Sequence, residues 1–361
     1  MDTSDPDIQF DDKGICNHCR HYDYLVKKFV FDGDDGKEKL QHIIKEIKDV
    51  GIGREYDCII GVSGGVDSSF VAYKVKQLGL RPLAVHLDNG WDSELAVKNI
   101  ELFLKKLDID LYTHVIDWEQ FKDLQLSFLY ASTTDSEIPS DHAINAILHE
   151  IANEKKVKYI IYGCNIRTES HLPRTWSQGH LDWKYIVSIH KKYGHLPLTT
   201  FPHMDFFNLN RNLIAHKTIN ILNYLSYSKK DAMILLENEL GWKYYGGKHY
   251  ESIYTRFYQG YILPKKFGYD KRKTHLSSLI CSGEINRSEA IDELKKEPYP
   301  VEMQREDKEY VIKKFGLSEQ EFERIMNLPK QKYEDFPSYG NSRIYRGLSL
   351  FFNQIGKVFH K

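Results

Sequence analysis

One short segment, Ser-Gly-Gly-Val-Asp-Ser-Ser at residues 63–69, constrains the fold of this chain more than any other part. It follows an apolar run at 58–62 and precedes a run at 70–75 that has the composition of a helix. A strand that ends in a glycine-rich turn and leads into a helix can hold phosphate. Glycine lets the backbone approach an anion, and the first N–H groups of the helix have no partner within it. The residues expected to hold phosphate are Ser63, Gly64, Gly65, Val66, Asp67, Ser68 and Ser69.

Asp67 is unusual in such a loop, because phosphate repels a carboxylate unless a cation lies between them. The segment therefore predicts magnesium bound at Asp67. The Walker A pattern does not fit, since no lysine precedes the serines. The pattern that fits is S-G-G-x-D-S, and in it the chain resembles the PP-loop ATP pyrophosphatase superfamily. That resemblance implies cleavage of ATP to AMP and pyrophosphate. The alternative is a structural Gly-Gly turn with serine caps.

Apolar runs alternate with helical patterns up to about residue 163. The expected strands are 57–62, 82–88, 111–116 and 158–163, and the expected helices between them are 67–78, 92–107, 119–130 and 141–155. This alternation predicts an α/β fold with a doubly wound parallel sheet, in which ligands lie at the carboxyl ends of the strands. Further helices are expected at 211–225, 229–239, 287–296, 304–315 and 317–327.

The pattern divides the chain into three expected parts. Residues 1–35 would form a partial zinc-ribbon-like segment, and residues 36–200 a PP-loop ATP pyrophosphatase α/β domain. Residues 201–361 would form a mainly helical region that binds the substrate or a partner.

Two further strand ends carry polar residues expected to contact the nucleotide. His86 and Asp88 end the second strand, and Gly163 and Asn165 end the fourth. An Asx turn at Asp88 and a helix cap near Asn165 are the structural alternatives. Cys164 is either a reactive thiol or a small wall residue.

Cys16 and Cys19 form a C-x-x-C motif, which supplies two of the four ligands of a zinc site. His18, His21 and Cys281 are possible completions, although none lies at a recognised spacing. The sequence thus predicts an incomplete zinc site. Five widely spaced cysteines also favour a reducing compartment over a disulfide framework.

The formal net charge of −1 argues against a nucleic-acid partner, which normally requires a basic surface. No apolar run reaches the length of a membrane span, and the first residues are acidic rather than those of a secretory signal. These features predict a cytoplasmic protein without a membrane span.

Several blocks of the chain resemble the N-acetyl sugar amidotransferase family, whose members are PP-loop enzymes of surface-polysaccharide and sialic-acid-like sugar pathways. Besides the phosphate-binding segment, the resembling blocks are 2–8 with 14–19, 88–91, 168–170, 244–252 and 282–285. Members of that family usually carry another C-x-x-C just before the position of Met1. In the family pattern, Cys16 and Cys19 would be the second half of a Cys₄ zinc site.

The resemblance implies a reaction that converts an acetamido group of a nucleotide-linked sugar into an acetamidino group, as in O-antigen biosynthesis. ATP would adenylylate the amide oxygen, and ammonia would then displace AMP. Lys248 and Lys265 are the candidate catalytic cations near the phosphates. The chain shows no glutaminase motif of its own. The expected partners are therefore a separate glutaminase and a cyclase-like ammonia-conducting subunit, resembling those of imidazole glycerol phosphate synthase.

Two other functions fit parts of this pattern. One is a PP-loop enzyme that thiolates tRNA, and the other is a zinc-ribbon scaffold that binds nucleotide without turnover. Release of AMP and pyrophosphate distinguishes the three functions by the acceptor that it requires.

Overall fold

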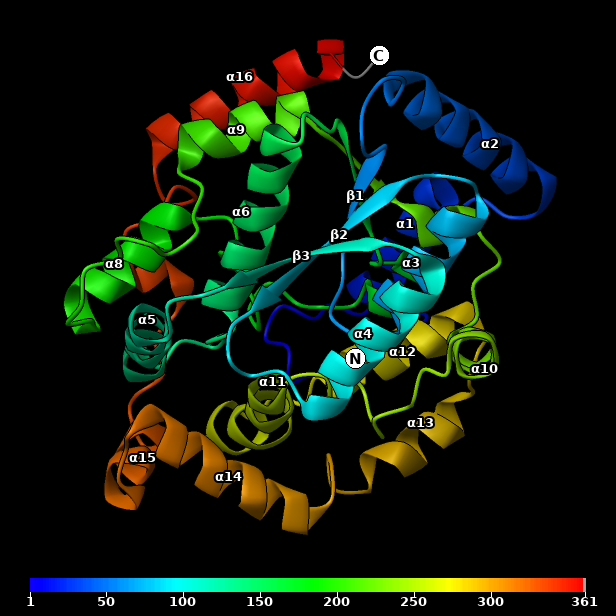
Figure 1. Cartoon of the computed structure of the whole chain (residues 1–361). Helices are drawn as coiled ribbons and strands as arrows, with labels where there is room; N and C mark the ends of the chain where they lie inside the picture. Colours follow the sequence, from blue (N-terminus) through cyan, green and yellow to red (C-terminus); the bar gives the residue numbers. More distant parts are fainter. Residues whose placement is uncertain (360–361) are drawn as a thin grey trace.

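The computed structural model describes residues 1–359, and its centre is a five-stranded parallel sheet (Figure 1). The strand order is β3-β2-β1-β4-β5. The strands are β1 (Cys58–Gly61), β2 (Pro82–Asp88), β3 (Asp110–Val115), β4 (Tyr159–Tyr162) and β5 (Lys217–Asn220). Every neighbouring pair is parallel, with Ile59 of β1 opposite Leu83 of β2 and Ile160 of β4. The predicted α/β fold with a parallel sheet is confirmed.

Helices cover both faces of the sheet, because successive side chains of a strand point to opposite faces. Ile59 packs in one hydrophobic cluster, whereas Cys58 and Ile60 pack in a second. The first cluster includes side chains of α5 (Trp118–Ala131), α6 (Ile138–Glu154) and α8 (Trp183–Tyr193). The second includes side chains of α2 (Gly33–Val50), α3 (Val66–Gln77), α4 (Glu94–Leu107) and α10 (Lys229–Leu240). The three central strands, β1, β2 and β4, are buried on both faces, which explains their continuous apolar sequence.

The fifth strand is a departure from the expected pattern. The helix expected at 211–225 is wrong: α9 (Phe206–Ala215) is followed by β5 and by the 3₁₀-helix η1 (Ile221–Tyr224). The four residues of β5 alternate in burial at the sheet edge, and their backbone partners come from β4. So short and half-polar a strand gives little periodic signal of its own. The sheet therefore extends beyond residue 200, where the α/β part was expected to end.

Most of the remaining chain is helical, as expected. The helices are α7 (Ile166–Glu169), α11 (Ile253–Phe257), the π-helix η2 (Tyr258–Phe267), α12 (Arg272–Ser282), α13 (Arg287–Leu294), α14 (Val301–Phe315), α15 (Glu319–Met326), the 3₁₀-helix η3 (Tyr333–Asp335) and α16 (Arg343–Phe359). Side chains of α11, η2, α14 and α15 join the same cluster as α5 and α6. The C-terminal region is thus packed onto one face of the sheet.

The N-terminal segment does not form the expected ribbon. Its strand-like part is a single antiparallel bridge between Phe10 and Cys16, and α1 (Asn17–Phe29) follows directly. Cys16 is the N-cap of α1, and its sulfur accepts a hydrogen bond from the backbone N–H of Cys19. Within residues 1–359, every helix is too short or too polar to cross a bilayer.

Candidate active site

The phosphate loop, residues 63–69, connects β1 to the first turn of α3. Gly65 is the N-cap of α3, and Gly64 has a φ of +77°. A Cβ atom at position 64 would lie 2.6 Å from the carbonyl oxygen of Ala96 in α4. Only glycine suits a position that combines a positive φ with so close an approach of two backbones. The loop is thus held against α4, with the free N–H groups of α3 at its surface.

The serine hydroxyls of the loop bond to one another and to the loop backbone. Ser63 Oγ lies 3.3 Å from Ser68 Oγ and accepts the Gly65 N–H at 3.4 Å. Ser68 Oγ also donates to the carbonyl of Gly65 at 3.2 Å. Because these hydrogen bonds are long and therefore weak, the serine hydroxyls can turn to donate to a bound anion instead.

Two aromatic side chains from the segment after α10 brace the loop. Trp242 Nε1 donates to the carbonyl oxygen of Gly64 at 3.0 Å, and Tyr245 Oη accepts the N–H of Val66 at 3.3 Å. One of the first N–H groups of α3 is therefore already hydrogen-bonded to Tyr245. Neither residue was expected at the loop, although Tyr245 lies in the block 244–252 that carries the family resemblance.

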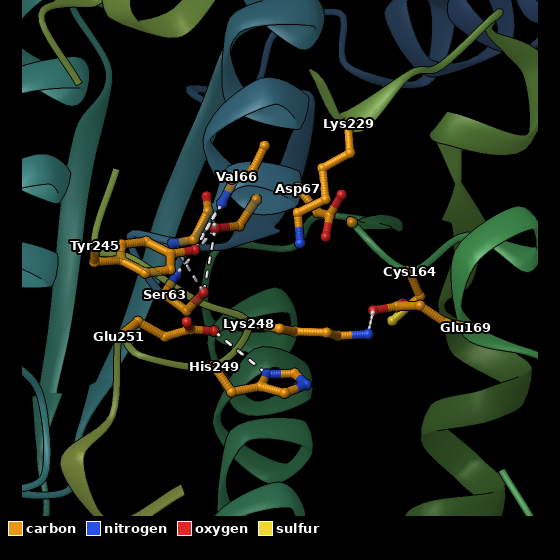
Figure 2. A pocket seen from close by; sticks show the side chains of 13 residues that line it. Ser63, Val66, Asp67, Cys164, Glu169, Lys229, Tyr245, Lys248, His249 and Glu251 are labelled. Atoms are coloured by element: carbon orange, nitrogen blue, oxygen red, sulfur yellow. Dashed lines mark hydrogen bonds and ion pairs between the residues drawn. The ribbon is translucent and has the colours of Figure 1, made fainter. Parts of the chain in front are cut away.

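A pocket of about 210 Å³ opens over the loop (Figure 2). Lys229 points toward Asp67, and Lys248 crosses the pocket to Glu169, where the Nζ–Oε1 distance is 3.4 Å. Tyr227, which is 160 residues from Asp67 in the sequence, donates a hydrogen bond to the Asp67 carboxylate. Two ammonium groups, a carboxylate pair and the N-terminus of a helix thus surround one small space. Such a site suits a polyanion that carries a cation.

Enclosure by the protein raises the pKa of the Asp67 carboxyl, although Lys229 opposes that shift. The charge of Glu169 adds to the rise, and the hydrogen bond from Tyr227 counters it. A divalent cation between the two carboxylates would remove this repulsion. Carboxylate oxygens are the ligands that magnesium prefers, so Asp67 and Glu169 fit the predicted ion.

The pocket shares walls with larger cavities, of which two have room for a ligand beside the phosphate loop. One, of about 420 Å³, lies at the ends of β1 and β2 and shares Ser63, His249 and Glu251 with it. The other, of about 430 Å³, lies between α7 and α12 and shares Cys164, Glu169, Lys248 and His249. We call them the strand-end cavity and the α12 cavity. Their arrangement gives room for one ligand on each side of a bound triphosphate.

The other predicted nucleotide contacts fall into different places. His86 lines the strand-end cavity, where one ring nitrogen lies 2.9 Å from the Val62 carbonyl and the other 3.0 Å from Asp92 Oδ2. Both nitrogens therefore serve as donors. Burial favours the neutral ring, but Asp92 and the carbonyl raise the pKa of His86. Asp88 instead accepts the Gly90 N–H at 2.9 Å, which is the Asx turn given as the alternative.

The end of β4 contributes Gly163 and Cys164 to the pocket wall. A Cβ at position 163 would lie 3.2 Å from the backbone of Asp67 and Ser68, so this strand end and the loop are in close contact. Enclosure by the surrounding protein, with the charges of Glu169 and Asp67, raises the pKa of the Cys164 thiol to about 12. A thiol that stays protonated suits a wall residue. Asn165 caps α7 by accepting the Thr168 N–H at 3.0 Å, and it does not line the pocket.

Of the two predicted catalytic lysines, Lys248 lies in the pocket and Lys265 does not. Lys265 is exposed on η2, with its Nζ 3.9 Å from the centre of the Tyr261 ring. It does not line the pocket over the phosphate loop, and η2 contributes Gln259 and Gly260 to the α12 cavity instead. Lys229 takes the second cationic position, and nothing in the local sequence of α10 indicated this.

A polar cluster, in which Asp135 and Glu137 are buried, lines the strand-end cavity. Lys271 Nζ lies 3.8 Å from Asp135 and 3.6 Å from Glu137, and His180 lies 3.4 Å from Asp141. Asp141 lines both larger cavities. Enclosure by the protein raises the pKa of Asp141 to about 6, with a contribution from the charges of Asp135 and Glu137. Asp141 can therefore exchange a proton near neutral pH.

The chain was compared with protein families, with curated proteins and with solved structures. Residues 251–349 match the family model described as LPS biosynthesis protein WbpG-like, C-terminal domain. No curated protein matches the chain.

Three solved structures resemble the fold distantly. NMN synthetase from Francisella tularensis is 15% identical over 72% of this chain and 97% of its own, with a TM-score of 0.36. NH3-dependent NAD synthetase from Campylobacter jejuni is 12% identical over 82% of this chain and 99% of its own, with a TM-score of 0.32. NAD+ synthetase from Burkholderia pseudomallei is 16% identical over 40% and 59%, with a TM-score of 0.28. At these TM-scores the likenesses are too distant to support a conclusion.

The parallel sheet with an S-G-G-x-D-S loop between β1 and α3 is the arrangement that the resemblance to the PP-loop ATP pyrophosphatase superfamily predicts. The C-terminal match specifies the protein further. Residues 251–349, about a quarter of the chain, are similar to the C-terminal domain of WbpG-like LPS biosynthesis proteins.

Proposed function

We propose that this protein is an ATP-dependent amidotransferase that converts the acetamido group of a nucleotide-linked sugar into an acetamidino group. The observation that carries the proposal is the junction of two parts. The phosphate loop faces Lys248, and Lys248 also lines the α12 cavity together with residues of the WbpG-like match. An acceptor in that cavity would lie beside a triphosphate on the loop.

The α12 cavity has the polar lining that a phosphorylated sugar requires. Arg256, Lys271 and Arg272 supply cations, and Tyr250 and Tyr299 supply aromatic faces. Arginine and lysine pair with phosphate, and aromatic rings stack on sugars or bases. The strand-end cavity, with His86 and the ends of β1 and β2, is left for the adenosine of ATP.

The proposed reaction has two steps. The carbonyl oxygen of the acetamido group attacks the α phosphorus of ATP, and the bond to the β-phosphate oxygen breaks to release pyrophosphate. Ammonia then adds to the carbon of the O-adenylyl imidate. The C–O bond breaks, and AMP leaves with the former amide oxygen. The product is the amidine.

Residues of the phosphate loop would hold the departing pyrophosphate through the N–H groups of α3 and the hydroxyls of Ser63 and Ser68. Lys229 and Lys248 would neutralise its charge. Asp67 and Glu169 would hold the magnesium ion, which when bound supplies positive charge to the phosphates. Asp141 would accept the proton released when ammonia adds, because its pKa of about 6 lets it act near neutral pH.

We further propose that ammonia comes from a separate glutaminase through a cyclase-like conducting subunit. The support is the sequence, which has no glutaminase motif of its own. Mixing the chain with such a pair should allow glutamine to replace ammonia in the assay.

The test follows the amide oxygen. The purified protein is given ATP, magnesium, ammonium and an N-acetylated nucleotide sugar whose carbonyl carries ¹⁸O. Mass spectrometry should find the label in AMP and a product in which NH replaces oxygen. ADP as the only nucleotide product, or unlabelled AMP beside amidine, would refute the mechanism. Stimulation by tRNA instead of sugar would favour the thiolating alternative.

Asp67→Asn should abolish turnover while the protein stays folded, since an amide cannot offer the anionic oxygen that magnesium needs. Asp88→Asn is the matched control, because asparagine also forms the Asx turn observed there. AMP release and the circular dichroism spectrum measure the two properties. Turnover by Asp67→Asn near that of Asp88→Asn would contradict the role of Asp67.

A further inference from the structure

Three cysteines and a histidine meet at a place outside the active-site pocket. Cys16 and Cys19 come from the start of α1, His171 from the loop after α7, and Cys281 from the last turn of α12. The sulfur atoms of Cys16 and Cys19 are 3.4 Å apart, and Cys281 Sγ lies 3.8 Å from His171 Nε2. The ligand atoms of Cys19, His171 and Cys281 all lie within 4.8 Å of one another.

We propose that these four side chains form a structural zinc site of the Cys₃His type. Zinc bonds of about 2.3 Å to sulfur and 2.0 Å to nitrogen place tetrahedral ligand atoms about 3.5–3.8 Å apart. The Cys16–Cys19 and Cys281–His171 separations of 3.4 and 3.8 Å lie close to these values. Cys19, His171 and Cys281 already form a compact group, and Cys16 adjoins it through Cys19. Thiolate and imidazole ligands in a tetrahedral set favour zinc over magnesium or calcium.

The histidine is already oriented as a metal ligand. Ser278 Oγ lies 3.2 Å from the carbonyl of Thr274, to which it can donate, and 2.9 Å from His171 Nδ1, from which it can then accept. In that arrangement His171 carries its proton on Nδ1, and Nε2 presents a lone pair toward Cys281. A hydrogen bond on the other ring nitrogen is the usual support of a zinc-bound histidine.

The helices place the ligands at suitable spacing. Cys16 and Cys19 are three residues apart at the start of α1, and Ser278 and Cys281 are three residues apart on α12, so each pair lies on one helix face. Cys16 and His171 are buried, which shields a bound ion from water.

The proposal differs from the two earlier expectations about zinc. It replaces a zinc ribbon within residues 1–35 by a site that joins three distant segments, and it needs no second C-x-x-C. Its position also suggests a purpose. His171 is two residues from Glu169, and α12 begins at Arg272, directly after its N-cap residue Lys271, both of which line the α12 cavity. The ion would fix both walls of the active site to the N-terminal segment.

The rival interpretation is a redox pair, since a C-x-x-C motif at a helix start can form a disulfide. At 3.4 Å the two sulfur atoms are not bonded, because a disulfide requires about 2.05 Å. All five cysteines are free.

The test is metal binding by the whole chain. Wild-type protein should contain one zinc per chain, and replacement of zinc by cobalt should give the visible bands of tetrahedral Co²⁺ with a charge-transfer intensity for three thiolates. His171→Ala and Cys281→Ser should lose the zinc, whereas Cys164→Ser should keep it. Ser278→Ala, a milder change, should weaken zinc affinity about 10–100-fold.

Chelation should lower the Tm of the wild type and leave that of Cys281→Ser unchanged. Full zinc content in both His171→Ala and Cys281→Ser would overturn the proposal, as would metal-free wild type that forms a Cys16–Cys19 disulfide. The cobalt spectrum of the wild type tests the site even where a variant fails to fold.

Discussion

Replacing Gly64 by alanine tests how the phosphate loop is held in place. Gly53 offers a matched control, because its φ of +76° is nearly that of Gly64 at +77°. A Cβ at position 53 would meet nothing within 4 Å, whereas one at position 64 would lie 2.6 Å from the Ala96 carbonyl oxygen. The two variants therefore share the cost of a left-handed alanine and differ in the contact with α4.

The loss of stability in each variant follows from the cost of a left-handed alanine and the cost of the contact with α4. A left-handed alanine costs about 1–2 kcal/mol, and both variants should lose that amount of stability. Ordinary contact at such a position begins near 3.4 Å. The overlap at position 64 is thus about 0.8 Å against a backbone atom that cannot rotate away, and overpacking of this kind costs about 1–3 kcal/mol more. The loop can relieve the overlap only by moving away from α4, which displaces the N–H groups that would hold phosphate.

The assay pairs stability with nucleotide binding. Urea unfolding should show Gly64→Ala to be less stable than Gly53→Ala by about 1–3 kcal/mol. Calorimetric titration with α,β-methylene-ATP and magnesium should show affinity lowered about 10-fold or more in Gly64→Ala, since 1.4 kcal/mol corresponds to a factor of 10. Gly53→Ala should bind like wild type. Equal stability and equal affinity in the two variants would refute the idea that packing on α4 positions the loop.

Two other predictions concern charge. His149 is buried with its Nδ1 2.8 Å from Nδ1 of His216, and burial lowers the pKa of His149 to about 4. Its neutral form should therefore contribute about 3 kcal/mol of stability that is fully present above pH 6.5 and is lost as the pH falls toward 4. Urea unfolding should be measured at about pH 7.5 and 4.5, which span that range. Between these pH values His149→Gln should lose less unfolding free energy than the wild type, and an equal loss would contradict the role given to His149. Lys248→Met should lower kcat/KM for ATP at least about 10-fold by removing a phosphate cation, whereas Lys265→Met should leave it unchanged. Steady-state pyrophosphate release measures both, and equal effects would refute the placement of these lysines.

The sequence correctly predicted the strand–turn–helix around residues 63–69 and the core of the sheet, because both depend on neighbouring residues. An apolar strand, a glycine turn and a helix start are consecutive features, so residues 58–77 contain their own structural signal. The alternation of apolar and amphipathic stretches then requires a parallel sheet with helices on both faces. β5 was missed because its backbone hydrogen-bond partners belong to a distant strand, β4. The paired residues Tyr159 and Lys217 are 58 positions apart in the sequence.

The side chains that surround the loop could be found only in the tertiary structure. Tyr227 reaches Asp67 across 160 residues of chain, and Tyr245 reaches Val66 across 179. Lys265 and Lys248 look alike in the sequence, yet one stacks on Tyr261 and the other points into the pocket. The choice depends on how the C-terminal helices pack on the sheet.

By itself, the amino-acid sequence determined the strand, glycine turn and helix start of the predicted phosphate site, because their residues are consecutive. Only the tertiary structure decided which cations and carboxylates complete that site, and that His171 and Cys281 lie beside the C-x-x-C motif. A local hydrogen-bonding pattern is encoded by adjacent residues. A meeting of distant side chains depends on the burial of many helix faces at once, and no single segment encodes it.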